Sequence, residues 1–149
     1  MTMRNVLLTA HILSAVLIIG WLAMQSMVIP GVIRRGPSGA GFVRASADLS
    51  KKIGPASFLV FVLGLALVLR QKDDYAEFKH AWVNLSMLLF IVTAVIGAVF
   101  IGRAEERAAE KLEAGETALD EARTISILGG VSTLMLTAIV WLMVDKPGL

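Results

Sequence analysis

Residues 81–102 read AWVNLSMLLFIVTAVIGAVFIG, a run that contains no charged side chain. A helix of this length crosses the ~30 Å hydrocarbon layer of a membrane. Further uncharged runs occupy residues 6–29, 55–69 and 125–144. The run 55–69 is the shortest, and it spans with help from its flanking residues. Because only helices and closed barrels satisfy their backbone groups inside lipid, the pattern predicts a single all-α domain over residues 1–149, an antiparallel four-helix transmembrane bundle.

The composition agrees with a membrane protein and argues against several other classes. Apolar residues make up 56% of the chain, and the mean hydropathy is +0.75. The chain has no cysteine, which removes disulfides and thiolate metal sites. The net charge of +2 is explained by anchoring at a membrane surface, and the sequence contains no phosphate-binding loop. The lipid bilayer is therefore the expected surrounding, and nucleic acid is not an expected partner.

The basic residues predict an orientation for the bundle. Nine lysines and arginines lie in the segments 30–54 and 103–124, and five lie in the rest of the chain. Segments rich in lysine and arginine tend to stay on the cytoplasmic side of a membrane. We therefore expect a multi-pass protein of a bacterial-type inner (plasma) membrane, with both termini facing outward.

The segment Phe42–Ile53 has the pattern of an amphipathic helix. Phe42, Ala45 and Leu49 fall on one face, and charged residues occupy other faces. A glycine and Pro55 follow, and they are expected to end this helix before the second span begins. The sequence thus predicts a short amphipathic helix on the membrane surface between the first and second spans.

The segment 103–124 is dense in charge. It is rich in residues that favour helix, so we expect the third and fourth spans to continue past the membrane and to meet near Gly115. Charge-dense helix faces are usually solvated, and the segment is interpreted as a solvated helical hairpin. No Asp, Glu, Lys or Arg lies inside a predicted span, which argues against a proton-coupled drug exporter.

Polar and small residues predict which helix faces point into the bundle, because contact with lipid stabilises neither kind of side chain. In the first span this face holds His11, Ser14, Ile18, Trp21 and Gln25. In the third span it holds His80, Asn84, Met87, Ile91, Ala94, Ala98 and Gly102. In the fourth span it holds Gly129, Thr133 and Thr137. These faces are expected to be packing surfaces between helices.

The two histidines are the candidate functional residues. His11 and His80 are the only imidazoles, and they fall at similar depth because the first and third spans run parallel. Met87 lies deeper on the same face as His80 and offers a soft ligand. Such a set predicts a cofactor or metal site for haem or copper, formed by His11 and His80 with Met87. The alternative is structural, with His80 as an ordinary interfacial histidine at a helix start.

The order of residues in the first span resembles a known superfamily. His11-Ile12, Gly20-Trp21 and Val28-Ile29-Pro30 are similar to the first helix of the CopD-like copper-resistance membrane proteins and the HemJ-type protoporphyrinogen oxidases. The segment Phe78–Arg103 resembles their third helix more weakly. The resemblance implies a haem-linked role for His11. It is closest to the superfamily members of unknown function, because the lysine that the HemJ-type enzymes carry early in the third helix is missing here.

Two functional hypotheses follow from these patterns. The one we favour is a non-enzymatic membrane bundle that acts as a subunit, assembly factor or self-associating protein, with a second copy or another membrane protein as partner. The alternative is a haem- or copper-binding membrane protein that uses His11. The sequence indicates no catalytic residue, and it does not identify a substrate.

Single cysteines introduced into this cysteine-free chain test the orientation. Ser38→Cys and Gly115→Cys are expected to be protected from a membrane-impermeant thiol reagent in intact cells, because both lie in the basic segments. Lys146→Cys is expected to react. Labelling of Ser38→Cys combined with protection of Lys146→Cys would reverse the assigned orientation.

Overall fold

The computed structural model describes residues 2–70 and 80–145, and nearly all of these residues are helical. The long helices are α1 (Met3–Met27), α3 (Ala40–Arg70), α4 (Ala81–Val95), α5 (Gly102–Glu113) and α6 (Leu119–Asp145). The short elements are α2 (Ile29–Ile33), the 3-10 turn η1 (Gly36–Gly39) and the π-helical turn η3 (Ile96–Ile101). α2 continues the path of α1, and η3 joins α4 to α5, so the chain forms four helical rods.

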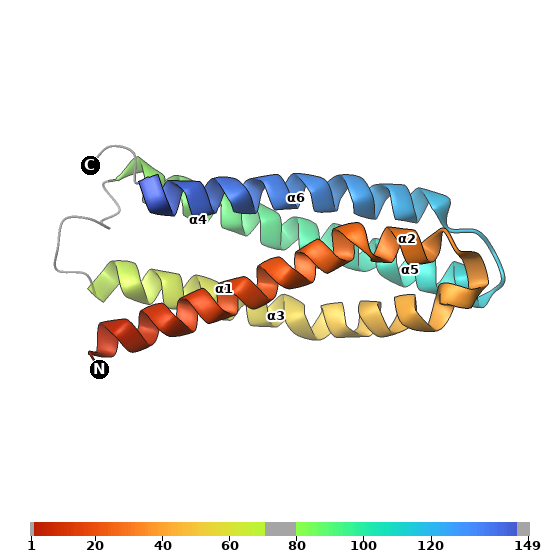
Figure 1. Ribbon diagram of the computed structural model, residues 1–149, viewed down its shortest axis with the longest axis horizontal. Helices are drawn as coiled ribbons and strands as arrows, with labels where there is room; N and C mark the ends of the chain where they lie inside the picture. Colours follow the sequence, from red (N-terminus) through yellow and green to blue (C-terminus); the bar gives the residue numbers. More distant parts are fainter. Residues whose placement is uncertain (1, 71–79, 146–149) are drawn as a thin grey trace.

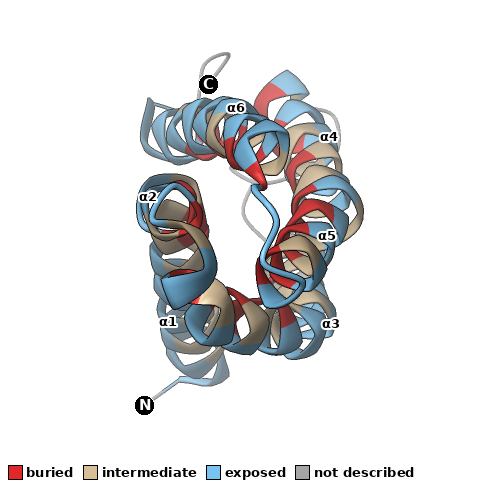
Figure 2. Ribbon diagram, turned by 90° about the vertical axis from the view of Figure 1, so that its right-hand side faces the viewer, coloured by how far each residue is buried: buried red, intermediate tan, exposed pale blue. Residues whose placement is uncertain are grey.

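The four rods form an antiparallel bundle (Figure 1). α1 begins and α6 ends at the same end of the bundle. The other end, formed by α2, η1, α5 and the start of α6, is called the polar end below. α1 packs against α3 and α6, while α5 packs against α3 and α4 packs against α6, which closes the ring (Figure 2). Each predicted span lies within one rod that is long and apolar enough to cross a membrane, so the predicted all-α four-helix fold is confirmed.

The outer faces of the helices carry large apolar side chains. Leu17 and Leu134 are each 73% exposed, and Phe58 is 66% exposed. The buried residues face the inside of the ring (Figure 2). A contiguous apolar surface of this kind promotes association in water, whereas hydrocarbon accepts it without penalty. The bundle is therefore built to be surrounded by lipid along its middle.

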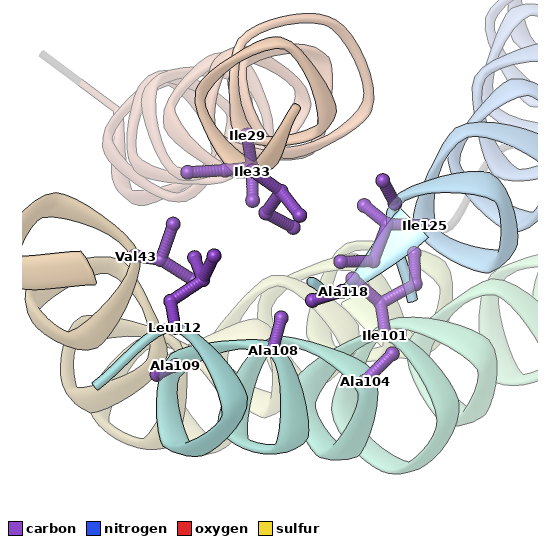
Figure 3. Close-up of a cluster of buried hydrophobic side chains, with 11 residues drawn as sticks. Ile29, Ile33, Val43, Ile101, Ala104, Ala108, Ala109, Leu112, Ala118 and Ile125 are labelled. Atoms are coloured by element: carbon purple, nitrogen blue, oxygen red, sulfur yellow. The ribbon is translucent and has the colours of Figure 1, made fainter. Parts of the chain in front are cut away.

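The largest group of buried apolar side chains lies at the polar end, where α2, α3, α5 and α6 meet (Figure 3). Its members are Ile29, Ile33, Val43, Ile101, Ala104, Ala108, Ala109, Leu112, Ala118, Ala122 and Ile125. The predicted extension of two rods past the membrane and the turn near Gly115, which has φ +79°, are confirmed. The interpretation of 103–124 as a merely solvated hairpin is wrong. Its alanines form one face of α5, and the hydrophobic effect buries that face wherever it would otherwise meet water.

The predicted separate surface helix is wrong, because α3 is a single helix that contains Pro55 in its interior. Membrane helices tolerate an internal proline when neighbouring groups satisfy the backbone. The packed face also differs from the predicted one. Val43 and Ala47 are 0% and 1% exposed beside α5, whereas Phe42 and Leu49 are exposed. Close packing against the alanine face of α5 selects small and β-branched side chains over the large ones that the sequence pattern emphasised.

The predicted inward face of the third rod is confirmed only in part, since His80, Met87, Ala94 and Gly102 are half-buried. Asn84, Ile91 and Ala98 are exposed, and Ser86 and Thr93 are buried instead. Small hydroxyl side chains allow α4 to approach α6 as closely as alanine would. Near Ala98 the π-helical turn η3 also changes the spacing between side chains, so a repeat of four residues no longer follows one face.

The predicted inward face of the first rod is confirmed, and that of the fourth rod is confirmed only in part. The first-rod residues are all buried or half-buried: His11, Ser14, Ile18, Trp21 and Gln25. On α6, Gly129 is buried against Ser26 of α1. Thr133 and Thr137 are exposed, and their hydroxyls donate to backbone carbonyls one turn earlier in α6. Because those hydroxyls have hydrogen-bond partners within α6, they do not require a partner on a neighbouring helix.

Two adjacent glycines of α6 test the contact between α1 and α6. A Cβ at Gly129 would lie 2.4 Å from Cβ of Ser26, whereas a Cβ at Gly130 meets nothing within 4 Å. Gly129→Ala is expected to destabilise the bundle by about 1–3 kcal/mol because the helices must separate. Gly130→Ala is expected to be neutral or stabilising, since alanine favours helix. Thermal unfolding in mild detergent measures both, and equal midpoints would contradict the packing of α1 on α6.

Two alanines of α3 distinguish the observed packing from a helix lying on the membrane. Ala47→Asp is expected to destabilise the polar end by about 2 kcal/mol or more, because it places a carboxylate in a dry interface. Ala45→Asp is expected to be tolerated, since Ala45 is exposed. Thermal midpoints of the two variants provide the measurement. A larger loss for Ala45→Asp would favour the surface-helix arrangement instead.

Candidate functional site

His11 lies on the inward face of α1 and is fixed by a backbone group of α3. Its Nδ1 atom is 3.1 Å from the carbonyl oxygen of Val60. A carbonyl oxygen only accepts hydrogen bonds, so Nδ1 carries the hydrogen and donates it. The neutral ring therefore keeps its lone pair on Nε2, which is the atom available to a hydroxyl donor or to a metal.

The close approach of His11 to α3 depends on Gly64. A Cβ at Gly64 would lie 3.1 Å from Cε1 of His11, which is tighter than ordinary contact. Gly64 is one turn after Val60, so the missing side chain opens the space through which the ring reaches that carbonyl. The sequence pairs a histidine with a glycine on another span, and only the packing reveals that they belong together.

His11 lines a cavity of about 130 Å³ between α1, α3, α4 and α6. Its other lining residues are almost all apolar, with Phe61 and Phe90 among them. Two polar atoms in this lining, Nε1 of Trp82 and Oγ of Ser86, are buried and have no hydrogen-bond partner within the described residues. An unpaired buried donor is destabilising by about 1–3 kcal/mol, so native proteins rarely leave one without a reason.

The three residues predicted for a haem or copper site are not all brought together. His11 and Met87 line this cavity, whereas His80 is the N-cap residue of α4 and is not part of the lining. Among the described residues, no group of three or more His, Cys, Asp or Glu side chains could hold a metal ion. The assignment of His11, His80 and Met87 to haem or copper remains a prediction.

A second polar site lies where the membrane part of the bundle meets the polar end. Glu105 of α5 is 0% exposed. Its Oε1 atom is 3.1 Å from Oγ of Ser46, and its Oε2 atom is 2.7 Å from Oγ of Ser50, both on α3. Gln25 of α1 approaches from a third rod, with its Nε2 2.8 Å from Oγ of Ser50. Three rods thus enclose one carboxyl group.

The environment of Glu105 favours its neutral form. Burial raises the pKa of the Glu105 carboxyl above its ordinary value, and the hydrogen bonds with Ser50, Gln25 and Ser46 only partly oppose this effect. Glu105 lies beyond the uncharged run 81–102, in the part of the rod that belongs to the polar end.

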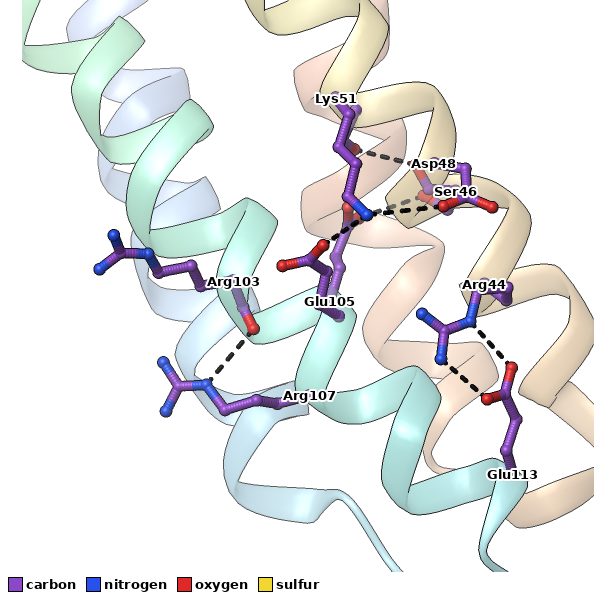
Figure 4. A network of polar contacts seen from close by, with 10 residues as sticks. Arg44, Ser46, Asp48, Lys51, Arg103, Glu105, Arg107 and Glu113 are labelled. Carbon is purple, nitrogen blue, oxygen red and sulfur yellow. Dashed lines mark hydrogen bonds and ion pairs between the residues drawn. The ribbon is translucent and has the colours of Figure 1, made fainter.

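Some of the other charged side chains around Glu105 form ion pairs on the surface (Figure 4). The guanidinium of Arg44 donates to both carboxylate oxygens of Glu113, at 2.9 and 2.8 Å, and this lowers the pKa of Glu113. The ammonium of Lys51 lies 2.6 Å from a carboxylate oxygen of Glu106. Because these pairs are solvent-exposed, they align α3 with α5 but contribute little to stability.

Glu105 is the functional candidate that sequence reasoning missed. It stands within a dense run of charges, and a sequence does not report which of several charges is covered. One signal was available: Glu105 shares the helix face of Ala104, Ala108 and Leu112, which repeat at helical spacing. The two serines at positions 46 and 50 likewise share one face of α3.

Four apolar rods with lipid-facing surfaces and buried polar groups define an integral membrane protein of the four-helix bundle class. The chain belongs to a family described as "Predicted integral membrane protein (DUF2269)", whose sequence model matches residues 5–147. No curated protein and no solved structure matches the chain.

The family match covers all four rods and confirms the prediction of a multi-pass membrane protein. It does not connect the chain to the CopD-like or HemJ-type proteins, so that resemblance remains a prediction. The bacterial-type inner membrane, the outward termini and the protein partners also remain predictions. Lys146 and the part of Phe78–Arg103 before residue 80 lie outside the described residues.

Proposed function

We propose that the protein binds, within the membrane, a lipid-soluble molecule whose head group is one oxygen-bearing ring, as in a quinone or quinol. The observation that carries this proposal is the cavity beside His11. It is apolar over nearly all of its lining but contains the unpaired N–H of Trp82 and the unpaired hydroxyl of Ser86. A ligand with oxygen acceptors would satisfy both groups.

The volume of the cavity supports a single-ring head group. At about 130 Å³ it is close to the ~150 Å³ of an engineered apolar cavity that binds benzene. Phe61 and Phe90 provide aromatic faces for a ring, and their own rings are stacked 6.2 Å apart.

The polar groups support a ring that carries both carbonyl and hydroxyl oxygens. Trp82 and Ser86 offer donors, which a carbonyl oxygen accepts. The lone pair on Nε2 of His11 accepts from a hydroxyl group, since Nδ1 already donates to Val60. A quinone and its reduced quinol present these two kinds of oxygen, and the apolar tail of such a molecule is compatible with the lipid around the bundle. The proposal concerns binding and assigns no catalytic residue.

A haem or copper site with His11 is the second candidate. The hydrogen bond from Nδ1 to a backbone carbonyl is the support that metal-ligating histidines commonly have, and Met87 lines the same cavity. A porphyrin contains four pyrrole rings, however, and the cavity has the volume of about one ring. Two donors are also few for copper. The residues therefore fit the single-ring ligand better. The subunit or assembly-factor role remains a prediction on which these contacts do not bear.

Titration with a short-chain benzoquinone in lipid nanodiscs tests the proposal. In a variant that keeps Trp82 as its only tryptophan (Trp21→Phe, Trp141→Phe), the fluorescence is expected to be quenched saturably. His11→Ala is expected to weaken binding about tenfold or more, the equivalent of one buried hydrogen bond. His80→Ala, outside the cavity lining, is the control and is expected to leave affinity unchanged.

A second pair of variants separates a loss of binding from a loss of folding. Gly64→Ala keeps His11 but crowds its ring, and is expected to weaken binding; Gly20→Ala meets nothing within 4 Å and is expected to leave it unchanged. Linear quenching that is the same in all variants would overturn the proposal. A Soret band in haem-supplemented protein that His11→Ala abolishes would replace it with the second candidate.

A further inference from the structure

The strongest remaining feature is the hydrogen-bond geometry around Ser50. Its hydroxyl oxygen has three neighbours: Nε2 of Gln25 at 2.8 Å, the backbone oxygen of Ser46 at 3.0 Å, and Oε2 of Glu105 at 2.7 Å. A hydroxyl group has one hydrogen to donate and accepts through its two lone pairs. The amide nitrogen of Gln25 is a donor and the backbone oxygen is an acceptor, so these two contacts use one lone pair and the hydrogen.

A proton on Glu105 allows the third contact to form together with the other two. The remaining lone pair of Ser50 faces Oε2 of Glu105, and two lone pairs do not form a hydrogen bond. All three contacts are satisfied together only when Oε2 carries a hydrogen and donates it to Ser50. Oε1 then remains an acceptor for the hydroxyl of Ser46 at 3.1 Å.

The charges near Glu105 do not supply a counter-ion for its ionised form. Several charged groups on the elements packed against it pair with other residues: Arg44 with Glu113, Lys51 with Asp48 and Glu106, and Lys111 with Glu121. On its own helix, Arg107 donates to the backbone oxygen of Arg103. The residue that faces Glu105 from α1 is the neutral Gln25. A buried ionised carboxylate with no ion-pair partner would be destabilising, whereas a hydrogen-bonded carboxylic acid is not.

A water-sized cavity lies beside this network, between α1, α3, α4 and α6. The cavity has a volume of about 50 Å³ and is lined by Gln25, Ser50, Ser57 and Thr93 among apolar residues. That volume holds a water molecule, and the lining has enough polar groups to bind one. Toward the tip of the polar end, the buried cluster that contains Val43 and Ala108 is entirely apolar. Ser50 thus has Glu105 on one side and the cavity on the other.

We propose that Glu105 is a proton-binding site of the bundle, and that it exchanges its proton with the cavity in the membrane interior through the hydroxyl of Ser50. When Glu105 gives up its proton, the O–H bond at Oε2 breaks as that proton bonds to Oγ of Ser50, and the hydrogen that Ser50 held before leaves to a water in the cavity. Ser50 is again a neutral hydroxyl, Glu105 is a carboxylate, and the water carries the proton. Two O–H bonds break and two form, so no oxidant or reductant is needed. This site is independent of the ligand proposed beside His11.

Infrared spectroscopy of the intact protein in nanodiscs tests the protonation state. At neutral pH we expect the C=O stretch of a protonated carboxyl group, and we expect Glu105→Gln to abolish it. Glu106→Gln is the matched control, since Glu106 is the next residue in α5 and forms a surface pair with Lys51. Absence of the band from the native protein, or its persistence in Glu105→Gln, would overturn the proposal.

The dependence of stability on pH provides a second readout. Because the folded-state pKa of Glu105 is raised, the folded chain binds the proton more strongly than the unfolded chain. Its contribution is complete below the unfolded pKa of about 4.3 and is lost as the pH rises toward the folded value. Glu105→Gln cannot ionise, so its thermal midpoint is expected to fall less than that of the native protein on going to higher pH. Parallel curves would contradict the proposal.

The exchange route is tested through the two serines. Transfer to heavy water replaces the carboxyl proton with deuterium and shifts the C=O band. We expect Ser50→Ala to slow this shift, because Ser50 contacts both Glu105 and the cavity, and Ser46→Ala to leave its rate unchanged, because Ser46 does not line the cavity. Exchange in Ser50→Ala as fast as in the native protein would overturn the route.

Discussion

The rods of this bundle are longer than a membrane is thick, and the rest of the structure depends on that mismatch. α3 has 31 residues and therefore measures about 46 Å, against ~30 Å of hydrocarbon. The excess lies at the polar end, where water is available and the hydrophobic effect can act. There the residues around Ala108 form a dry core of the kind found in water-soluble domains. Within lipid that force is absent, and close contacts such as Gly129 on Ser26 hold the helices together.

One candidate site lies in the lipid-embedded part of the bundle, and the other lies where that part meets the polar end. The cavity beside His11 lies in the lipid-embedded part, where the hydrophobic effect does not drive the helices together. Glu105 lies at the boundary, where rods from α1, α3 and α5 approach closely enough to exclude water from a carboxyl group. Each site depends on a small residue of α3: Gly64 admits the histidine ring, and Ser50 contacts the carboxyl group.

The candidate sites were predictable to different degrees. His11 stands out in the sequence because an imidazole inside an apolar run needs a partner, and the structure gives it the carbonyl of Val60. The association of His11 with His80 rested on equal depth alone, and depth does not fix the face on which a side chain lies. Glu105 was hidden for the opposite reason. It is one of many charges in its segment, and what distinguishes it is the cover provided by Ser46 and Ser50, more than fifty residues earlier in the chain.

The sequence by itself determined the class of the protein, the number of spans and their approximate ends. These follow from the length of the uncharged runs, because that local property decides whether a helix can cross the hydrocarbon layer. Only the tertiary structure decided that α3 continues through Pro55, that Asn84 and Ala98 are exposed, and that Glu105 is buried. Those outcomes depend on which surfaces the neighbouring rods present. The pattern of one helix does not contain that information. A small residue can face lipid or a packed interface, and a charged residue can face water or a polar interface, until the neighbouring helix is in place.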